Sequence, residues 1–431
     1  MRQQPLRRLS LLWLVFLLTG SLFTGCQIGT TEQATASSTP QDIVRPCSKP
    51  FFPVTQVMML PQQPSSDSVY FLSGVHIYAL NAGTGALRWC VHAGNAQSHL
   101  ATYGSVAPLL PNPPPPPEGI MGIAVNQGTI FAGSENGYTY AFDAPTGKMV
   151  WRHLTWFGTT TAPTVLDGVV YVASDKLYAL NARDGSQRWT APSQDVIASS
   201  PLIVKHTIYL GSYDNHIYAL DQTTGSKQWA YQTKGRVYVG PVVDQDRLFF
   251  GAGDDGPSVY AITTQGKLLW HNPMIISSSI AVSNGLLYVG TNTTLYALST
   301  QDGTVRWSLP MNDPLTFLVS ENILYVTSGS TGLYALNKAD GTLRWHNPLR
   351  SMRAGETTLP ILIKDRLYVG TIDVGVSPSK AMIHAIDKEQ GTTYWQASVD
   401  WNISTLGVAA EQFLGESKRS SSLEKQMIFS I

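Results

Sequence analysis

The feature that most constrains this chain is a short segment that it repeats eight times. One copy reads LYALNARDGSQRW, from Leu177 to Trp189, and each copy places a glycine four residues before a closing tryptophan. The fifth copy is one residue shorter than the others between its alanine and its glycine. The closing residues are Trp89, Trp151, Trp189, Trp229, Trp270, Trp307, Trp345 and Trp395. Most of them recur about every 40 residues, which indicates an array of similar units.

Each unit carries signals for strands only. Ahead of the repeated segment lies a run rich in β-branched and aromatic residues, such as VVYVAS at 169–174, and a shorter apolar run precedes it, such as APTVL at 162–166. The repeated segment itself supplies a third strand, a turn and a fourth strand. Charged residues make up only 13% of the chain, which suits short strands joined by tight turns. The pattern predicts an all-β fold, a single eight-bladed β-propeller with four antiparallel strands per blade.

The repeated residues have a packing explanation. A glycine in the turn adopts a positive φ and lets a neighbouring group approach its bare backbone. The tryptophan offers a large flat face that can fill the wedge between two blades. We therefore expect the eight closing tryptophans to be blade-docking core residues and not a ligand-binding cage.

The first 25 residues are typical of an export signal. Three arginines precede an apolar run over residues 9–18, which is too short to span a bilayer comfortably. Residues 22–26 resemble a bacterial lipobox, with Phe23 where leucine is usual. We therefore expect lipidation of Cys26 and anchoring to a bacterial membrane, outside the cytoplasm. Plain secretion, with Cys26 as a spectator, is the alternative.

The composition divides the remaining chain into three parts. Residues 26–46 are small and polar and predict a flexible tether, 47–410 form the propeller, and 411–431 have no repeat partner and predict a disordered tail. We expect residues 404–410 to close the ring as the innermost strand of the first blade, with 54–60 flanking them. The competing arrangement makes 54–60 the innermost strand.

Two cysteines remain besides the one in the lipobox. In an exported protein, Cys47 and Cys90 favour one disulfide, which would join the end of the tether to the strand that carries Trp89. Two buried free thiols are the alternative. Without the three arginines of residues 1–25, the chain has 26 basic and 29 acidic residues, a net charge of −3. This charge provides no phosphate-binding surface, so we expect no nucleic-acid partner.

The spacing of the repeat resembles the tryptophan-docking motif of the pyrroloquinoline quinone (PQQ) type repeat, over residues 54–410. Enzymes of that family bind a quinone and a cation, and their alcohol-oxidising members also carry two adjacent cysteines. Here the three cysteines are never adjacent, and the long insertions that build the cofactor chamber are missing. No pair of the nine histidines has metal-ligand spacing in the sequence. We therefore expect no catalytic, cofactor-binding or metal-binding residues; a PQQ-dependent dehydrogenase is the alternative.

A lipid-anchored propeller with blades of near-minimal length is also similar to the BamB family of outer-membrane assembly lipoproteins. That resemblance implies a scaffold or adaptor that docks a protein or peptide partner through the loops of one face. A cell-surface propeller that binds another ligand is the alternative. We expect a monomer in either case.

The partner-binding face is expected where the fourth strand of each blade crosses to the first strand of the next, because these loops surround the mouth of the central channel. Aromatic residues and arginines are the types that anchor interfaces. The residues of these loops are Trp156, Phe157, Asp195, Arg236, Tyr238, Asn312, Arg350, Arg353 and Glu356. We expect the site to centre on Arg236, Tyr238 and Arg353. The alternative is that these charges pair with one another or are simply solvated.

Overall fold

The computed structural model describes residues 44–46, 52–53, 67–93, 119–155, 158–159, 161–193, 195–197, 199–253, 257–276, 279–312, 314–349, 357–373, 380–400 and 406–410. All of them belong to one compact unit, Asp42–Ile431. Within these ranges the secondary structure consists of strands and turns, and no helix there is long and apolar enough to cross a membrane.

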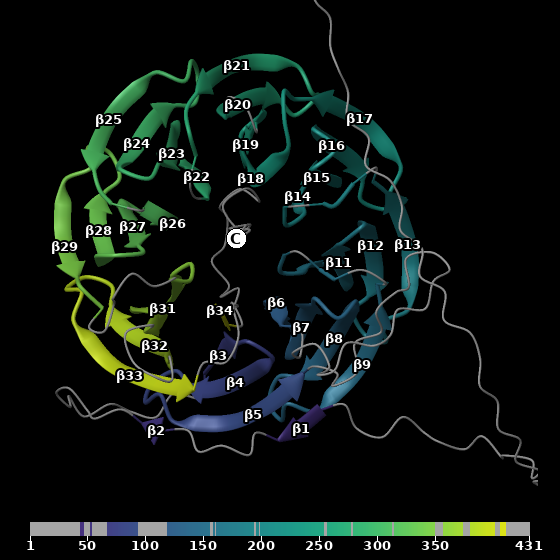
Figure 1. The fold of residues 1–431 in the computed structure, drawn as a ribbon, viewed down its shortest axis with the longest axis vertical. Coiled ribbons are helices and arrows are strands. Elements are labelled where there is room, and N and C mark those ends of the chain that lie inside the picture. The colour runs from purple at the N-terminus through teal and green to yellow at the C-terminus, as the bar shows by residue number, and fades with distance from the viewer. Residues whose placement is uncertain are drawn as a thin grey trace, which may run out of the picture. The chain divides into compact units, whose positions relative to one another are not determined.

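The strands form eight antiparallel sheets arranged in a ring, which confirms the prediction of an eight-bladed β-propeller (Figure 1). From the innermost strand outward, blade 1 contains β34 (Leu406–Ala410), β3 (Ser68–Ser73), β4 (His76–Asn81) and β5 (Leu87–Ala93), and blade 2 contains β6 (Ile120–Asn126), β7 (Thr129–Ser134), β8 (Tyr138–Asp143) and β9 (Met149–Leu154). Blade 3 contains β10 (Thr164–Leu166), β11 (Val169–Ala173), β12 (Lys176–Asn181) and β13 (Gln187–Pro192). Blade 4 contains β14 (Leu202–Val204), β15 (Thr207–Ser212), β16 (His216–Asp221) and β17 (Lys227–Gln232).

The second half of the ring repeats this order. Blade 5 contains β18 (Val237–Asp244), β19 (Arg247–Ala252), β20 (Ser258–Thr263) and β21 (Leu268–Pro273), and blade 6 contains β22 (Ile280–Ser283), β23 (Leu286–Gly290), β24 (Thr294–Ser299) and β25 (Val305–Pro310). Blade 7 contains β26 (Pro314–Ser320), β27 (Ile323–Ser328), β28 (Gly332–Asn337) and β29 (Leu343–Asn347). Blade 8 contains β30 (Ile361–Ile363), β31 (Arg366–Asp373), β32 (Lys380–Asp387) and β33 (Thr393–Asp400).

Strands from the two ends of the propeller sequence pair with each other and close the ring in blade 1. Strand β34 pairs antiparallel with β3, from Leu406 opposite Ser73 to Ala410 opposite Val69. This confirms the C-terminal segment as the innermost strand of blade 1. The segment 54–60, which was its competitor for that position, lies outside the described residues.

The N-terminal part of the chain adds a fifth strand to each of the two blades at the closure. Strand β1 (Val44–Pro46) pairs with the outer edge of β5, and β2 (Phe52–Pro53) pairs with the outer edge of β33. Strand β1 lies inside the segment predicted as a flexible tether, so the sheet of blade 1 begins before residue 47. Neither strand was predicted, because neither belongs to a repeat.

The docking of each tryptophan on a glycine of the next blade holds neighbouring blades together. In blade 4, Gly225 has a φ of +71°, and a Cβ placed on it would lie 2.5 Å from Cε3 of Trp189 in blade 3. The same relation holds around the whole ring, including the closure, where Trp395 of blade 8 covers Gly85 of blade 1. The tryptophan also packs on an aromatic residue of the second strand, such as Tyr171 beside Trp189 with ring centroids 6.0 Å apart.

All eight tryptophans belong to or pack against the hydrophobic layers between blades, as expected, but they differ in exposure. Trp151 and Trp395 are buried, whereas the other six are half-buried. The indole lies at the edge of the sheet, between an outer strand and the turn of the next blade, so part of the ring faces solvent. The residues that are fully buried are the alanines opposite the tryptophans, such as Ala79 opposite Trp89.

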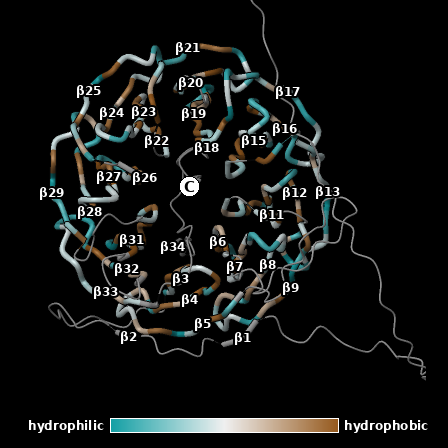
Figure 2. The backbone as a smooth tube through the Cα atoms, viewed as in Figure 1, coloured by the Kyte–Doolittle hydropathy of each residue, from teal (hydrophilic) through white to brown (hydrophobic). Residues whose placement is uncertain are grey.

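The hydrophobic core is divided into layers between adjacent blades. The layer between blades 3 and 4, for example, joins Leu177 and Ala179 of β12 to Ile208 and Leu210 of β15. Figure 2 shows hydrophobic colour on second strands such as β19 and β31, and hydrophilic colour on the outer strands β13 and β17. The core is therefore a ring of similar interfaces, as expected when each repeat buries its hydrophobic faces against its neighbours.

Several predictions fall outside the described residues. They concern the lipidation of Cys26, the identity of Cys47 as a disulfide partner, and the disorder of residues 411–431. Cys90 itself is disulfide-bonded. Strand β1 ends with Pro46 opposite Val91, the residue that follows Cys90, which agrees with a partner near the end of β1. Its pairing with Cys47 stays a prediction.

Candidate partner-binding face

The order of strands brings two kinds of loop to the same face of the ring. In an antiparallel blade the chain reverses after every strand. The loops that cross from one blade to the next therefore lie at the same end as the turns between second and third strands. In blade 4 these are residues 193–201 and the β15–β16 turn, 213–215. The predicted binding residues lie in crossing loops, so turns such as β15–β16 contribute to the same surface.

The structure describes four of the nine predicted binding residues. Asp195, Arg236 and Asn312 are exposed, and Tyr238 is half-buried in β18, where it packs against the core layer between blades 5 and 6. The backbone oxygen of Asn312 accepts a hydrogen bond of 2.7 Å from the hydroxyl of Ser328. The remaining predicted residues lie outside the described part of the chain; they are Trp156, Phe157, Arg350, Arg353 and Glu356.

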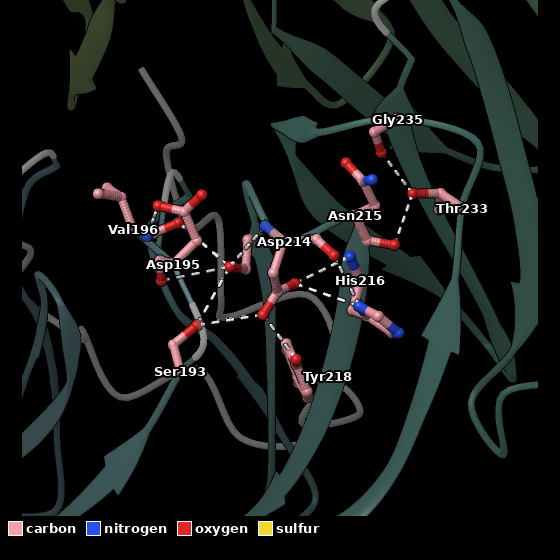
Figure 3. A network of polar contacts seen from close by, with 10 residues as sticks. Ser193, Asp195, Val196, Asp214, Asn215, His216, Tyr218, Thr233 and Gly235 are labelled. Carbon is pink, nitrogen blue, oxygen red and sulfur yellow. Dashed lines mark hydrogen bonds and ion pairs between the residues drawn. The ribbon is translucent and has the colours of Figure 1, made fainter.

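The β15–β16 turn is held between two crossing loops (Figure 3). On one side, the backbone nitrogen of Tyr213 donates to the oxygen of Val196 at 3.0 Å. On the other side, the backbone nitrogen and the hydroxyl of Thr233 donate to the oxygen of Asn215 at 2.8 and 2.9 Å. Both loops carry a predicted binding residue, Asp195 in the first and Arg236 in the second. The β15–β16 turn, residues 213–215, is therefore a fixed platform with Asp195 on one side and Arg236 on the other.

The exposed part of this platform is an arginine stacked on a tyrosine. The guanidinium carbon of Arg236 lies 5.3 Å from the centre of the Tyr213 ring, and 37% of Tyr213 is exposed. A guanidinium over an aromatic face is held there by the ring quadrupole while its edge can still donate hydrogen bonds. Of the residues on which the site is predicted to centre, Arg236, Tyr238 and Arg353, the first lies over the ring of Tyr213, which the prediction did not include. Tyr213 was not predicted, because it lies in a turn within a blade and not in a crossing loop.

Below this platform lies a nearly buried carboxylate. The side chain of Asp214 is 5% exposed, and it accepts hydrogen bonds from the Tyr218 hydroxyl at 2.7 Å and from the His216 backbone nitrogen at 3.1 Å. Its other contacts are with the imidazole of His216 at 3.3 Å and the hydroxyl of Ser193 at 3.5 Å. Burial, and then the hydrogen bond to Asp214, raise the pKa of Tyr218, so this phenol stays a proton donor. The network fixes the turn from beneath.

The geometry of this network does not form a nucleophilic triad. In a triad the histidine lies between the nucleophile and the acid, whereas here Asp214 lies between Ser193 and His216 (Figure 3). In blade 2 the amide of Asn136 donates to the hydroxyl of Tyr140 at 2.9 Å from the equivalent turn. The contact between turn and tyrosine is therefore a repeated structural feature.

A cavity of about 490 Å³ opens beside the network, between blades 3 and 4. Its wall is apolar along Leu177, Leu210 and Leu220, and Tyr218 lines it with a polar group. The small residue Ala191 lines the cavity close to Gly225. At the equivalent position of blade 7, the longer side chain of Asn347 donates to the backbone oxygen of Gly391 at 2.7 Å.

No group of three or more histidine, cysteine, aspartate or glutamate side chains is arranged to hold a metal ion in the described ranges. The chemical resources of this face are thus an exposed arginine–tyrosine pair and a flanking carboxylate, and the cavity beside them extends between the blades as far as the β16–β17 turn. Such a set can bind another molecule, and it contains no recognisable catalytic arrangement among the described residues.

Comparison with known proteins gives one family match that covers most of the ring. The model of the family described as outer membrane protein assembly factor BamB matches residues 73–176, 158–273 and 255–405. Among curated proteins, BamB of Moranella endobia is 24% identical over 204 residues, which are 43% of this chain and 53% of that protein. BamB of Yersinia pestis is 32% identical over 71 residues, 16% of this chain and 18% of that protein.

A third curated relative is an enzyme. The tetrathionate hydrolase of Acidithiobacillus ferrooxidans is 38% identical over 60 residues, 13% of this chain and 12% of the enzyme. The chain spans at most about half the length of the curated relatives it matches.

Solved structures share the fold. BamB from Moraxella catarrhalis aligns with a TM-score of 0.55 at 16% identity, over 86% of this chain and all of that chain. A quinohemoprotein alcohol dehydrogenase from Pseudomonas putida aligns with a TM-score of 0.54 at 15% identity, over 74% of this chain and 71% of that chain. At these identities the likeness is one of architecture alone.

Proposed function

The chain belongs to the family of outer membrane protein assembly factor BamB, and on this basis we propose that it is a membrane-anchored, extracytoplasmic scaffold that binds a protein partner in outer-membrane protein assembly. Its site is the face formed by the crossing loops and the β15–β16 turn. The lipid on Cys26 holds the ring at the membrane, and the binding face holds the partner.

The observation that carries the proposal is the stacked pair of Arg236 and Tyr213. Arginine and tyrosine are enriched at the energetic centres of protein interfaces. The hydrogen bonds of the turn fix the backbone that carries Tyr213, which reduces the conformational freedom to be lost on binding. Asp195 adds a hydrogen-bond acceptor on the other side of the turn. With the Arg236 donor on one side and this acceptor on the other, the surface favours one orientation of a polar partner.

Site-specific cross-linking tests the binding face. A photoreactive residue in place of Tyr213 should cross-link to a protein of the outer-membrane assembly apparatus in intact cells, and the same label in place of Leu343, exposed on the outer strand β29, should not. Arg236→Ala should reduce complex recovery at least about tenfold, because interface arginines at such centres contribute roughly 2 kcal/mol or more. Equal recovery with Arg236→Ala, together with equal cross-linking from both positions, would contradict the proposal.

Fractionation tests the anchor separately. Cys26→Ser should move the protein from the membrane fraction to the soluble fraction, because the acyl chains supply the membrane affinity. A variant that stays in the membrane fraction at the wild-type level would show that another feature holds it there.

A quinone-dependent enzyme is the weaker alternative, because the described residues do not supply the ligands that the cofactor's cation needs. Such a cofactor requires a cation held by carboxylate and amide oxygens. The described residues offer no group of three acidic, histidine or cysteine side chains for it, and Cys90 is disulfide-bonded. Adding PQQ and Ca²⁺ to the purified protein should leave the cofactor spectrum unchanged; a stoichiometric spectral change would favour the enzyme.

A further inference from the structure

Two histidines that lie far apart in the repeat meet on blade 1. His76 begins β4 and His92 lies near the end of β5, and the register of these strands places them directly opposite each other. Their rings are 4.9 Å apart between centroids and are nearly perpendicular, at 67°. Both side chains are half-buried. The pair is therefore held by the sheet and still reachable from solvent.

The distance between the facing ring nitrogens suits a shared metal ion. Nδ1 of His92 lies 3.3 Å from Nε2 of His76. At this separation one imidazole donates a hydrogen bond to the other, and a bound ion would take the place of the shared proton. Two imidazole nitrogens, each about 2.0–2.1 Å from a tetrahedral ion, are roughly 3.3–3.4 Å apart. The pair thus already has the spacing of a chelate.

The type of ligand restricts the ion that fits. The ring of Tyr78 lies 6.1 Å from the ring of His76 and forms one wall. On the outer side, the backbone of β1 pairs with β5 at Arg45 opposite His92. Imidazole ligands suit Cu²⁺, Zn²⁺ and Ni²⁺, whereas Mg²⁺ and Ca²⁺ prefer oxygen ligands.

We propose that His76 and His92 form a two-histidine chelate for a divalent transition cation, Cu²⁺ or Zn²⁺, with water completing the coordination. Bound metal cross-links β4 to β5 in the blade that closes the ring. It therefore stabilises the folded chain, because the unfolded chain does not hold the two imidazoles together. This site is independent of the proposed partner-binding face.

Metal titration of the full chain, purified without an added polyhistidine tag, tests the site. Cu²⁺ should bind as one equivalent per chain more tightly than Zn²⁺, in the usual order of affinities. Both should raise the melting temperature, EDTA should reverse the rise, and Mg²⁺ should have no effect. Electron paramagnetic resonance of the Cu²⁺ form should show coupling to imidazole nitrogen.

Glutamine variants identify the ligands. His76→Gln and His92→Gln should each weaken Cu²⁺ binding at least about tenfold, since even the loss of a residue that only orients a ligand costs about 10–100-fold in affinity. His346→Gln is the matched control, because His346 is exposed and stacks on Tyr334 at 4.2 Å instead of facing another imidazole. Circular dichroism of each variant checks its fold. Undiminished binding in both folded variants, or no saturable binding to wild type, would overturn the proposal.

Discussion

Adding one methyl group at a docking glycine should loosen one blade interface by a calculable amount. We choose Gly225→Ala. This glycine has a φ of +71°, and the added Cβ would lie 2.5 Å from Cε3 and 2.7 Å from Cζ3 of Trp189. Carbon atoms cannot approach so closely, so the indole or the turn has to move.

The expected loss has two parts. A non-glycine residue in the left-handed region costs roughly 1–2 kcal/mol, and forcing extra volume into a packed site costs roughly 1–3 kcal/mol. Gly225→Ala should therefore lower the free energy of unfolding by about 2–5 kcal/mol. Gly168→Ala separates the two parts, because Gly168 has a φ of +70° and no heavy atom within 4 Å of the added Cβ. It should lose only about 1–2 kcal/mol.

Urea unfolding followed by tryptophan fluorescence measures both variants against wild type. A third protein carries Gly225→Ala together with Trp189→Leu. In that background the added methyl group no longer meets an indole, so Gly225→Ala should cost no more than Gly168→Ala does in the wild type. If Gly225→Ala and Gly168→Ala destabilise the protein equally, the tryptophan contact contributes nothing and our account of blade docking is wrong.

Three further predictions follow from single side chains. Burial lowers the pKa of His384 to about 4. Between about pH 6.5 and pH 4 the unfolded chain therefore binds a proton at this residue and the folded chain does not. The free energy of unfolding should fall by up to about 3 kcal/mol as pH drops through this window. His384→Tyr, the residue type found at this position in the other blades, should remove that slope in pH-dependent urea titrations. Ala191→Asn should raise the unfolding free energy by about 1 kcal/mol, because the new side-chain amide can donate to the backbone oxygen of Gly225, as the amide of Asn347 donates to that of Gly391. An unchanged or lower melting temperature would contradict this. Cys90→Ser should lower stability by about 2–5 kcal/mol in thermal unfolding, and a reducing agent should affect wild type but not this variant.

The fold was predictable because its information is local and repeated. Each copy of the motif specifies a strand, a turn whose glycine takes a positive φ, and a second strand, and these choices depend on residues close in sequence. Repetition then fixes the number of blades. The C-terminal closing strand was also predictable, because residues 406–410 follow Trp395 at the distance that separates a tryptophan from the next innermost strand. Strands β1 and β2 were not, since they belong to no repeat.

The candidate site was predictable only in part. The sequence indicated that the crossing loops form the site, and Arg236 and Asp195 are among the residues predicted there. It could not show that Arg236 stacks on Tyr213 of the preceding blade, because that contact depends on how two blades pack. Tyr238, named as a central residue, is half-buried in its strand and packs against the core.

What the sequence alone determined is therefore the repeat: eight blades, their strand order and the tryptophan–glycine contacts between them. The tertiary structure decided which side chains meet, and the histidine pair shows why. A bulge after Ala79 shifts the register of β4 against β5, so that Leu80 faces Leu87 while His76 faces His92. Without that single extra residue, the register of Leu80 and Leu87 would place His76 opposite Val91, and His92 would point to the other face of the sheet. Side-chain pairing across strands depends on such one-residue shifts, which only the folded sheet fixes.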